Sequence, residues 1–377
     1  MMKPEEVERA LTFHVLKAAT LSFERAQEDR ISIYNTMVSL VKEYREYISQ
    51  FFEKAIGPDW EGEVAKHAER RNKGVNAAMV DFLISGRVDI PLLRHLVENY
   101  KMAETREKAQ LRSLDKITGS MLLFTDYLMR IRGVGPRLSA LLLSKLHPIS
   151  RFNHASKLLA YVGLVPDHYR MVCKAGHKII ATSPKSFCPV RVKKPDGSVG
   201  SCGAEIVKVE FRKGEPPKRV AGYVVLCDNE VKSILLGRWA RSIIYQPPAK
   251  SGYRRLFDYF KQKEIGKRER LKAEGYLQKA KELTPGRINK RAIRKCAQIF
   301  LVNLWHAWRA YEGLPITKPY FLSKDVGFHV DYIPPFVDQP PTQEEWETGG
   351  WNTFKLMGIP VYVPRWTKPW YVPDYVP

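Results

Sequence analysis

The chain has 377 residues, of which 62 are Lys or Arg and 40 are Asp or Glu, so its formal net charge is +22. This length allows two or three domains with cores of their own, and so large a charge favours a polyanionic partner, DNA or RNA. No stretch approaches 18 uninterrupted apolar residues, and the N-terminus MMKPEEVERA lacks an apolar signal core, so we expect a soluble, cytoplasmic protein with no membrane partner.

The N-terminal residues 4–56 are predicted to form helix, beginning near Pro4 and ending before Gly57. From Tyr34 onward, apolar residues recur at the alternating three- and four-residue spacing of a coiled-coil seam, namely Met37, Val41, Tyr44, Ile48, Phe51 and Ala55. This seam could pair with another protomer to form a homo-oligomer, or pack within a helical bundle of the same chain. Because tyrosine is a poor seam residue and the flanking positions show no charge code, we favour the bundle.

Residues 59–131 continue as helices that are interrupted near Gly86 and at Asp89-Ile90-Pro91, where Pro91 restarts the helix. Asp81 is the one carboxylate here that lies among apolar residues, in the run MVDFLI, as an active-site aspartate on a strand would. Such a residue more often lies on the exposed face of a helix. No spaced set of carboxylates on strands accompanies Asp81, so we predict no acidic metal-dependent nuclease site in this region.

The pattern of a helix-hairpin-helix occupies residues 128–166, LMRIRGVGPRLSALLLSKLHPISRFNHASKLLAYVGLVP. We expect one helix to end at Ile131, a second to begin at Pro136 and a third to begin near Asn153. Gly133 and Gly135 allow the positive φ angles of a tight hairpin, and proline suits the first position of a helix. The alternative is that this turn merely joins two packed helices.

Backbone amides of this hairpin would form a seat for an anion at the start of the second helix, and a nucleic-acid phosphate is its natural occupant. The amides expected to contact phosphate are those of Val134, Gly135 and Arg137, with added charge from nearby side chains. The residues predicted to bind DNA here are Arg132, Gly133, Val134, Gly135, Arg137 and Lys145.

A change in composition marks residues 167–227, which are rich in Val, Lys, Gly and Pro and contain strand-like runs at 207–211 and 222–226. The predicted metal ligands in this insert are Cys173, His177, Cys188 and Cys202. Four such ligands can surround Zn²⁺ as a tetrahedron, and so small a β insert needs the stability of a structural zinc. The spacing is not that of a strict zinc ribbon, so reduced cysteines beside an unrelated histidine are the alternative.

Residues 250–295 contain 16 Lys or Arg and five Asp or Glu, interleaved with the aromatic residues Tyr253, Phe257, Tyr259, Phe260 and Tyr276. This mixture suits a surface that follows a sugar-phosphate backbone, or else a solvated helical hairpin with its aromatic residues turned inward. Arg287, Lys290 and Arg291 are a second predicted DNA-binding set. They precede an amphipathic helix whose buried stripe comprises Ile293, Cys296, Phe300, Leu304, Ala307 and Tyr311.

The tail from Pro334 holds nine prolines and four of the eight tryptophans. Such spacing opposes helix and favours extended or polyproline segments. Because exposed tryptophans on a free tail would promote aggregation, we expect the tail to wrap over the surface of the protein.

Two stretches resemble a known family. Residues 131–166 are similar to the C-terminal signature of the insertion-sequence 110/116/902 transposases, which is a Pro-Gly-Val-Gly hairpin, an Ala/Leu helix and a phrase of the form ISRF…KLAAYAGLVP. Arg132 replaces the usual proline of that hairpin. Residues 286–315, GRINKRAIRKCAQIFLVNLWHAWRAYEGLP, resemble the closing helix of the family. The resemblance implies DNA binding in transposition or recombination.

The resemblance leaves catalysis unassigned. Members of the family carry an N-terminal resolvase-like domain with four acidic residues, which we do not recognise here. They also carry a serine shortly after the GLVP phrase, where this chain reads DHYRMVCKAGHK. The serines of the insert, Ser183, Ser186, Ser198 and Ser201, do not match by context. Whether the protein is an enzyme therefore stays open, as does the need for a catalytic divalent metal.

Taken together, the sequence predicts a mainly α fold with a small β insert. We expect a helical, coiled-coil-like region (1–115), a transposase-like helix-hairpin-helix domain (116–318) with a zinc-ribbon-like insert at about 167–227 and a basic helical C-terminal part, and a Pro/Trp-rich extended tail (319–377). The predicted function is DNA binding of the insertion-sequence transposase type, in DNA transposition or recombination. The alternative is a non-catalytic binder of structured RNA or branched DNA.

Overall fold

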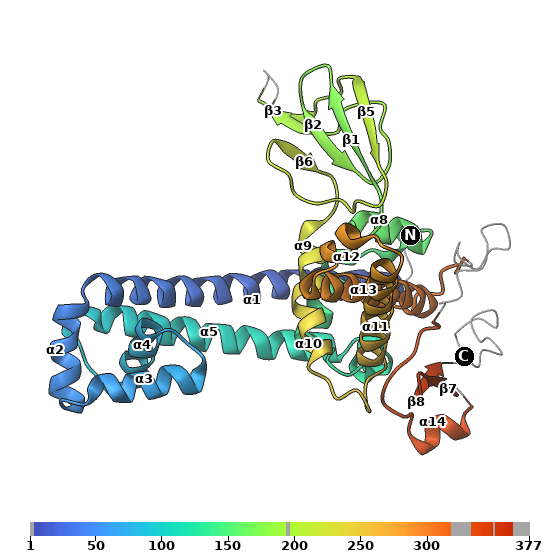
Figure 1. Ribbon diagram of the computed structural model, residues 1–377. Helices are drawn as coiled ribbons and strands as arrows, with labels where there is room; N and C mark the ends of the chain where they lie inside the picture. Colours follow the sequence, from blue (N-terminus) through green and yellow to red (C-terminus); the bar gives the residue numbers. More distant parts are fainter. Residues whose placement is uncertain (1–3, 194–196, 318–332, 350, 365–377) are drawn as a thin grey trace. The chain divides into compact units, whose positions relative to one another are not determined.

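A computed structural model describes residues 4–193, 197–317, 333–349 and 351–364 and shows a mainly helical protein with small β-sheets (Figure 1). The chain divides into two compact units, Met1–Gly119 and Ser120–Pro377. The boundary expected after residue 115 falls within a helix that continues to Gly119. Within the described ranges, no helix combines the length and the apolar character needed to cross a membrane.

The first unit is helical throughout its described part. Its elements are α1 (Pro4–Glu43), α2 (Arg45–Ile56), α3 (Trp60–Arg71), α4 (Val75–Ser85), a 3-10 turn (Pro91–Leu93) and α5 (Arg94–Gly119). The predicted interruptions are confirmed, since Gly86 ends α4 with a left-handed φ of +77° and Pro91 opens the turn that leads into α5.

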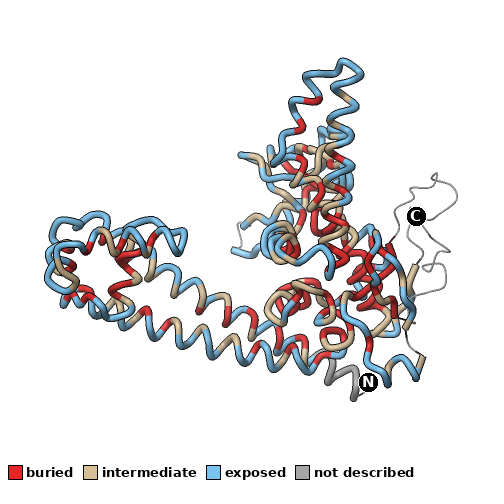
Figure 2. Tube along the Cα trace, turned by 60° about the horizontal axis from the view of Figure 1, so that its bottom comes forward, coloured by how far each residue is buried: buried red, intermediate tan, exposed pale blue. Residues whose placement is uncertain are grey.

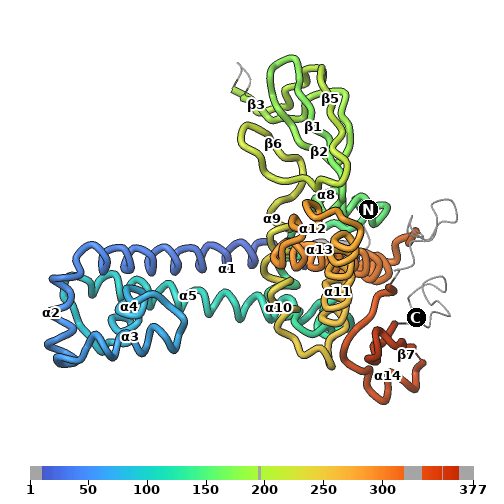
Figure 3. Tube along the Cα trace, in the orientation of Figure 1, coloured from blue at the N-terminus to red at the C-terminus, as the bar shows by residue number. Residues whose placement is uncertain are grey.

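The two long helices α1 and α5 run antiparallel, side by side (Figures 1 and 3). A polar layer links them, because Gln27 Nε2 donates to Glu107 Oε1 at 3.1 Å and the Arg30 guanidinium forms an ion pair with the same carboxylate. Arg30 Nη1 also donates to the hydroxyl of Tyr100 at 3.3 Å. Such a layer favours one register of the helix pair over others.

The predicted seam lies within a helical bundle of the same chain, because Met37, Val41 and Ile48 are buried in the core of the first unit. The seam breaks at Tyr44, which separates α1 from α2 and is 53% exposed. Phe52, rather than Ala55, is buried in the following turns. A homo-oligomer through these helices stays a prediction.

The second unit contains the remaining helices. These are α6 (Leu122–Asp126), α7 (Pro136–Leu146), α8 (Ala155–Val162), α9 (Asn229–Ser233), α10 (Ala240–Ile244), α11 (Gly252–Ala273), α12 (Leu277–Glu282), α13 (Pro285–Tyr311) and α14 (Gln343–Glu347), with 3-10 turns at Leu128–Arg130 and Ile149–Arg151 and a π-helical turn at Ile234–Trp239.

Helix α13 forms the centre of this unit, and most of its residues from Cys296 to Arg309 are buried. Figure 2 colours the chain by burial and shows buried residues gathered where helices pack together. The predicted stripe is largely confirmed, since Cys296, Phe300, Leu304 and Ala307 are buried, whereas Ile293 and Tyr311 are half-buried. The Trp239 ring stacks on Phe300 with centroids 4.8 Å apart. This aromatic packing holds the surrounding helices against α13.

The basic stretch 250–295 forms α11, α12 and the start of α13. Tyr253, Phe257 and Phe260 are buried, as expected for a helical hairpin with its aromatic residues turned inward. Tyr259 and Tyr276 remain exposed. The exposed cations therefore lie on the outer surface of a packed hairpin.

The β insert lies between helices α8 and α9 in the sequence (Figure 3). Its strands are β1 (His168–Cys173), β2 (Lys178–Ala181), β3 (Arg191–Lys193), β4 (Val199–Ser201), β5 (Ile206–Arg212) and β6 (Tyr223–Val225). One sheet has the order β5-β1-β2-β6, in which β1 is antiparallel to β2 and β5, and β2 is parallel to β6. Strands β3 and β4 form a separate antiparallel hairpin. The strands expected at 207–211 and 222–226 are thus confirmed.

The described part of the tail packs against the second unit. Phe336 is fully buried and stacks on Tyr253 with ring centroids 4.6 Å apart. The expectation that the prolines oppose helix is wrong at Gln343–Glu347, where Thr342 caps the short helix α14 with a capping box. An antiparallel hairpin of β7 (Trp351–Leu356) and β8 (Ile359–Pro364) follows. The rest of the predicted tail, at 319–332, 350 and 365–377, lies outside the described residues.

Candidate metal centre and nucleic-acid interface

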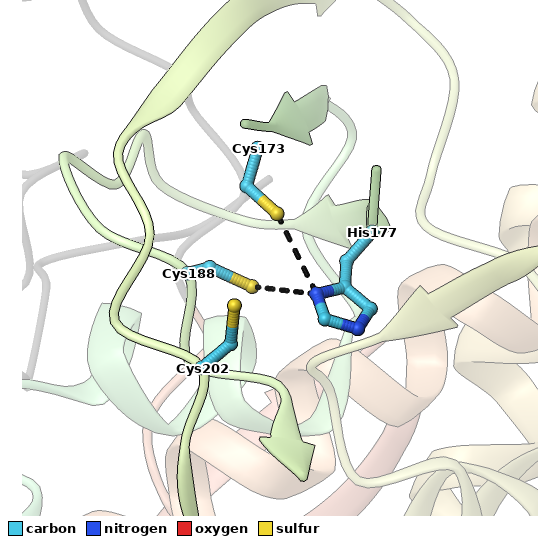
Figure 4. Close-up of side chains that lie close together, drawn as sticks. All are labelled: Cys173, His177, Cys188 and Cys202. Carbon is cyan, nitrogen blue, oxygen red and sulfur yellow. Dashed lines mark hydrogen bonds between the residues drawn. The ribbon is translucent and has the colours of Figure 1, made fainter. Parts of the chain in front are cut away.

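Four side chains of the β insert converge on one point (Figure 4). Cys173 ends β1, His177 lies in the turn that leads to β2, and Cys188 and Cys202 flank the β3–β4 hairpin. Their candidate ligand atoms all lie within 4.8 Å of one another. Across the described part of the chain, this is the one group of three or more Cys, His, Asp or Glu residues with such spacing.

Backbone geometry brings these ligands together. Gly176, with a φ of +82°, allows the tight turn in which its amide donates to the Cys173 carbonyl at 2.9 Å. At the base of the hairpin, the amide of Cys202 donates to the Val190 carbonyl at 2.8 Å, and that of Gly203 donates to the Cys188 carbonyl at 3.0 Å. Local turns and cross-strand hydrogen bonds therefore place the four ligands.

The interatomic distances fit a tetrahedral metal ion. Nδ1 of His177 lies 3.5 Å from Cys173 Sγ and 3.6 Å from Cys188 Sγ. A sulfur at about 2.3 Å and a nitrogen at about 2.0 Å from one zinc ion, at the tetrahedral angle, would lie about 3.5 Å apart. The residues present are therefore suited to hold zinc through three sulfurs and one imidazole nitrogen.

Two of the thiols differ in acidity. Burial raises the pKa of Cys173, but hydrogen bonds from the backbone amides of His177 and Ala175 and from neighbouring side chains outweigh it and bring the pKa to about 7. Burial and the neighbouring Cys173 raise the pKa of Cys188 to about 11. A second thiolate beside the first is unfavourable without a cation between them.

At the helix-hairpin-helix, the second and third helices start close to the predicted positions, at Pro136 and Ala155. The first helix does not continue to Ile131. Helix α6 ends at Asp126, a 3-10 turn follows to Arg130, and Ile131 itself is extended. Because α6 ends before the hairpin, contacts from other parts of the unit hold the hairpin in place.

Contacts from distant residues occupy much of the hairpin. The amide of Arg132 donates to Asp338 Oδ2 at 2.7 Å, and Ser242 Oγ donates to the carbonyl of Gly133. The amide of Val134 donates to the Ile131 carbonyl at 3.0 Å, and the Val134 side chain is buried. The expectation of an outward Val134 amide is therefore wrong, because the turn itself uses that donor.

Gly135, by contrast, is exposed and has open space around its α-carbon. It is the N-cap of α7, and because it has no side chain it cannot cap the first-turn amides of this 11-residue helix. Its φ of −102° lies outside the left-handed region, so the backbone here does not require glycine. Arg132 and Arg137, on either side, are half-buried.

Most of the remaining predicted DNA-binding cations are less available to a phosphate than Arg132 and Arg137, because they form ion pairs with carboxylates of the same chain. Lys145 lies in the last turn of α7, about 14 Å from Pro136 along the helix axis, and its Nζ lies 2.5 Å from Glu230. The charge of Lys145 therefore does not reach the hairpin, although the sequence predicted that it would. In the second set, Arg287 forms an ion pair with Glu282 at 3.1 Å and Arg291 forms one with Glu264 at 2.9 Å, whereas Lys290 is exposed.

Asp81 lies on helix α4, half-buried, and not on a strand. Lys73 Nζ donates to its Oδ2 at 2.7 Å, and the Tyr34 hydroxyl donates to its Oδ1 at 3.0 Å. His67 Nε2 lies 3.2 Å from Oδ2. Burial raises the pKa of Asp81, but these partners outweigh it and hold the pKa below its usual value.

Sequence reasoning did not find Asp338. Its carboxylate accepts hydrogen bonds from the amides of Arg132 and Gly252, both at 2.7 Å. Burial nevertheless raises its pKa to about 6. The only local signal is a carboxylate in the apolar, proline-rich run IPPFVDQPP, and nothing in that run indicates its distant partners.

The fold and the Cys/His cluster define a mainly helical protein with a zinc-ribbon-like insert. Residues 125–177 match the model of the Transposase IS116/IS110/IS902 family, a segment that includes the hairpin, α7, α8 and the first two cluster residues. Comparison with curated proteins and with solved structures gave no significant match. The family match indicates a transposase role.

Proposed function

We propose that the protein binds duplex DNA in transposition or recombination, with the start of α7 as a phosphate contact. The single observation that carries this proposal is the family match over 125–177, which coincides with the exposed start of α7. The net charge of +22 supports it, because each Lys or Arg that neutralises a phosphate releases counterions.

The start of α7 suits a phosphate because a helix N-terminus carries a partial positive charge and directs backbone amides outward. Gly135 leaves room for the approach of a phosphate, and Arg132 and Arg137 supply charge beside it. The proposed contact therefore uses Gly135 and the two arginines. The amides of Arg132 and Val134 are excluded from it by their present partners.

A second set of contacts is proposed on the surface of α11–α13. Exposed cations of this surface with no ion pair in the described ranges are Lys267, Arg270, Lys279, Lys281 and Lys290. Arg287 and Arg291 lie on the same hairpin and would first have to leave their carboxylate partners. This set would follow the backbone without reading sequence.

We further propose that Cys173, His177, Cys188 and Cys202 hold one structural Zn²⁺. The core beside the cluster is small, with Met171, Ile179 and Ala181 as its other buried members. A metal ion would supply the stability that such a core lacks. The proposal assigns no catalytic residue.

The DNA contact can be tested by placing a charge at the start of α7. Gly135→Asp supplies an N-cap carboxylate, which favours the helix but repels a phosphate. Gly135→Asn is the matched control, since it caps the helix without charge. We expect Gly135→Asp to weaken duplex binding about tenfold relative to Gly135→Asn, while both variants keep the stability of the parent.

The measurement is a salt titration of binding to a labelled duplex. The slope of log K against log salt should become less negative by about 0.9 for the loss of one phosphate contact. Equal affinity of the two variants at all salt concentrations would refute the contact at α7. Tighter binding of the parent to structured RNA or to a DNA junction than to duplex would favour the alternative function.

A further inference from the structure

Three side chains in the segment 187–193 are exposed and lie four and two positions apart. Phe187, Arg191 and Lys193 are exposed, whereas Cys188 is buried and Val192 is half-buried. Phe187 keeps 64% of its surface exposed, although it directly precedes Cys188, a buried residue of the Cys/His cluster. Because successive side chains of an extended segment point to opposite faces, the exposed residues share the outer face.

The opposite strand adds to this outer face. Phe187 forms an isolated antiparallel bridge with Glu205, and the β3–β4 ladder pairs Arg191 with Ser201 and Lys193 with Val199. Residues directly opposite in such a ladder project from the same face. Val199 is 67% exposed and Ser201 is exposed as well. We call the surface of Phe187, Arg191, Lys193, Val199 and Ser201 the hairpin face.

The cations of the hairpin face have no ion-pair partner among the residues that the structure describes. Within the described ranges, neither Arg191 nor Lys193 forms an ion pair, and nearby Lys185 is exposed without one as well. Glu205, across from Phe187, is held by Lys174, whose Nζ lies 2.5 Å from its carboxylate. The hairpin face is therefore complementary to a polyanion.

Contacts at the base of the hairpin restrain the backbone next to Phe187. Cys188 and Cys202 both belong to the metal cluster, and the amide of Cys188 donates to the Ala204 carbonyl at 2.8 Å. These contacts restrain the backbone on either side of the aromatic ring. A restrained, exposed ring loses little conformational freedom when a flat ligand stacks on it.

We propose that the hairpin face binds single-stranded DNA, with a base stacked on Phe187 and phosphates held by Arg191 and Lys193. An exposed aromatic ring beside unpaired cations is the arrangement that single strands use, because unpaired bases offer a free π-face. A duplex offers no such face along its length. The choice of DNA rests on the proposed function, since recombination separates the strands of DNA.

The test uses the full-length protein, zinc-loaded, with a labelled single-stranded oligothymidine and a labelled duplex. Phe187→Ala should weaken single-strand binding about tenfold, and Phe187→Tyr should restore it because stacking is retained. Arg191→Ala with Lys193→Ala should weaken single-strand binding too and make the slope of log K against log salt less negative by about 1.4, for two phosphate contacts. Duplex affinity should change less than twofold in each variant.

The matched control is Lys208→Ala with Lys213→Ala, which removes two exposed lysines from β5 and the residue after it rather than from the hairpin. Zinc content, measured for every variant, checks that the insert stays folded. The proposal is overturned if Phe187→Ala binds the single strand within twofold of the parent, or if the control loses as much affinity as the hairpin variant. Tighter binding to single-stranded RNA of matching sequence would overturn the assignment to DNA.

The two proposals fail separately. Loss of the Gly135→Asp effect on duplex binding, with the Phe187→Ala effect retained, would refute only the contact at α7. The reverse result would refute only the hairpin face.

Discussion

Asp338 accepts a hydrogen bond from the backbone amide of Arg132 at 2.7 Å, although 206 residues separate the two in the chain. The same carboxylate accepts from the amide of Gly252. One side chain thus joins the tail, the hairpin and the start of α11. It also removes one amide of the hairpin from the donors that a ligand could use.

The raised pKa of Asp338 predicts a pH-dependent stability. Burial brings this pKa to about 6, whereas an unfolded aspartate titrates near about 3.9. Between these values the folded chain binds more protons than the unfolded chain, so the contribution of Asp338 to the free energy of unfolding falls as pH rises. Two pKa units correspond to roughly 3 kcal/mol.

Asp338→Asn should abolish this contribution, because the amide does not titrate. We expect the stability of the parent relative to Asp338→Asn to fall by roughly 2 kcal/mol between pH 4 and pH 6, as measured by urea unfolding at several pH values. A difference that stays constant over this interval would show that Asp338 titrates normally in the folded protein.

Gly133 and Gly135 should respond differently to alanine. Gly133 has a φ of +85°, and a Cβ there would lie 2.8 Å from Ser242 Oγ. Gly133→Ala should therefore lower the free energy of unfolding by about 2 kcal/mol or more. Gly135→Ala has open space and an ordinary φ, so its stability should be unchanged or slightly raised.

Thermal unfolding of the two alanine variants, followed by circular dichroism, distinguishes the two sites. Equal losses would contradict the packing of Ser242 against the hairpin.

The proposed zinc site predicts that substitutions of different cysteines differ in their effect on zinc content. The purified protein should contain about one zinc ion per chain, and Cys202→Ser should lose it because one of four ligands is missing. Cys227→Ser is the control, since Cys227 is buried but lies outside the cluster. Metal analysis, with limited proteolysis of the insert, measures the outcome.

We expect the insert of Cys202→Ser to become sensitive to protease while Cys227→Ser resembles the parent. Zinc retained by Cys202→Ser, or lost by both variants, would count against the four-ligand site.

Asp81 predicts stability with the opposite pH dependence. Because its partners hold its pKa below the usual value, its contribution is present above the unfolded pKa and is lost as pH falls through the folded pKa. Asp81→Asn should cost about 1–2 kcal/mol at pH 7, and this cost should shrink in acid below about pH 4. Urea unfolding at pH 7 and pH 3 measures it.

The control for Asp81 is Asp89→Asn, which breaks an exposed pair with Arg94. It should change stability little, since solvent screens that pair. If Asp89→Asn cost as much as Asp81→Asn, the half-buried network around Asp81 would contribute no more to stability than an exposed ion pair.

The start and stop signals of the helices could be predicted because they act over a few residues. Pro91 and Pro136 open helical turns, and Gly86 ends one, as their backbone preferences dictate. The cluster of Cys173, His177, Cys188 and Cys202 could be predicted for a related reason. Soft ligands gathered in 30 residues of a β-rich insert can meet through short turns.

The state of the hairpin could not be predicted in the same way. The hydrogen-bond partners of its backbone, Asp338 and Ser242, are distant in the sequence. Lys145 forms its ion pair with Glu230, which follows the insert in the sequence. No local pattern encodes these partners.

The residues alone predict a basic, mainly helical chain with a hairpin before Pro136 and four candidate metal ligands in a β insert, because charge, turn chemistry and ligand spacing are local properties. Which amides of that hairpin remain open, and which face of the insert stays exposed, depended on packing between distant segments. A buried donor takes whatever acceptor the folded chain brings to it, and that acceptor lies far away in sequence.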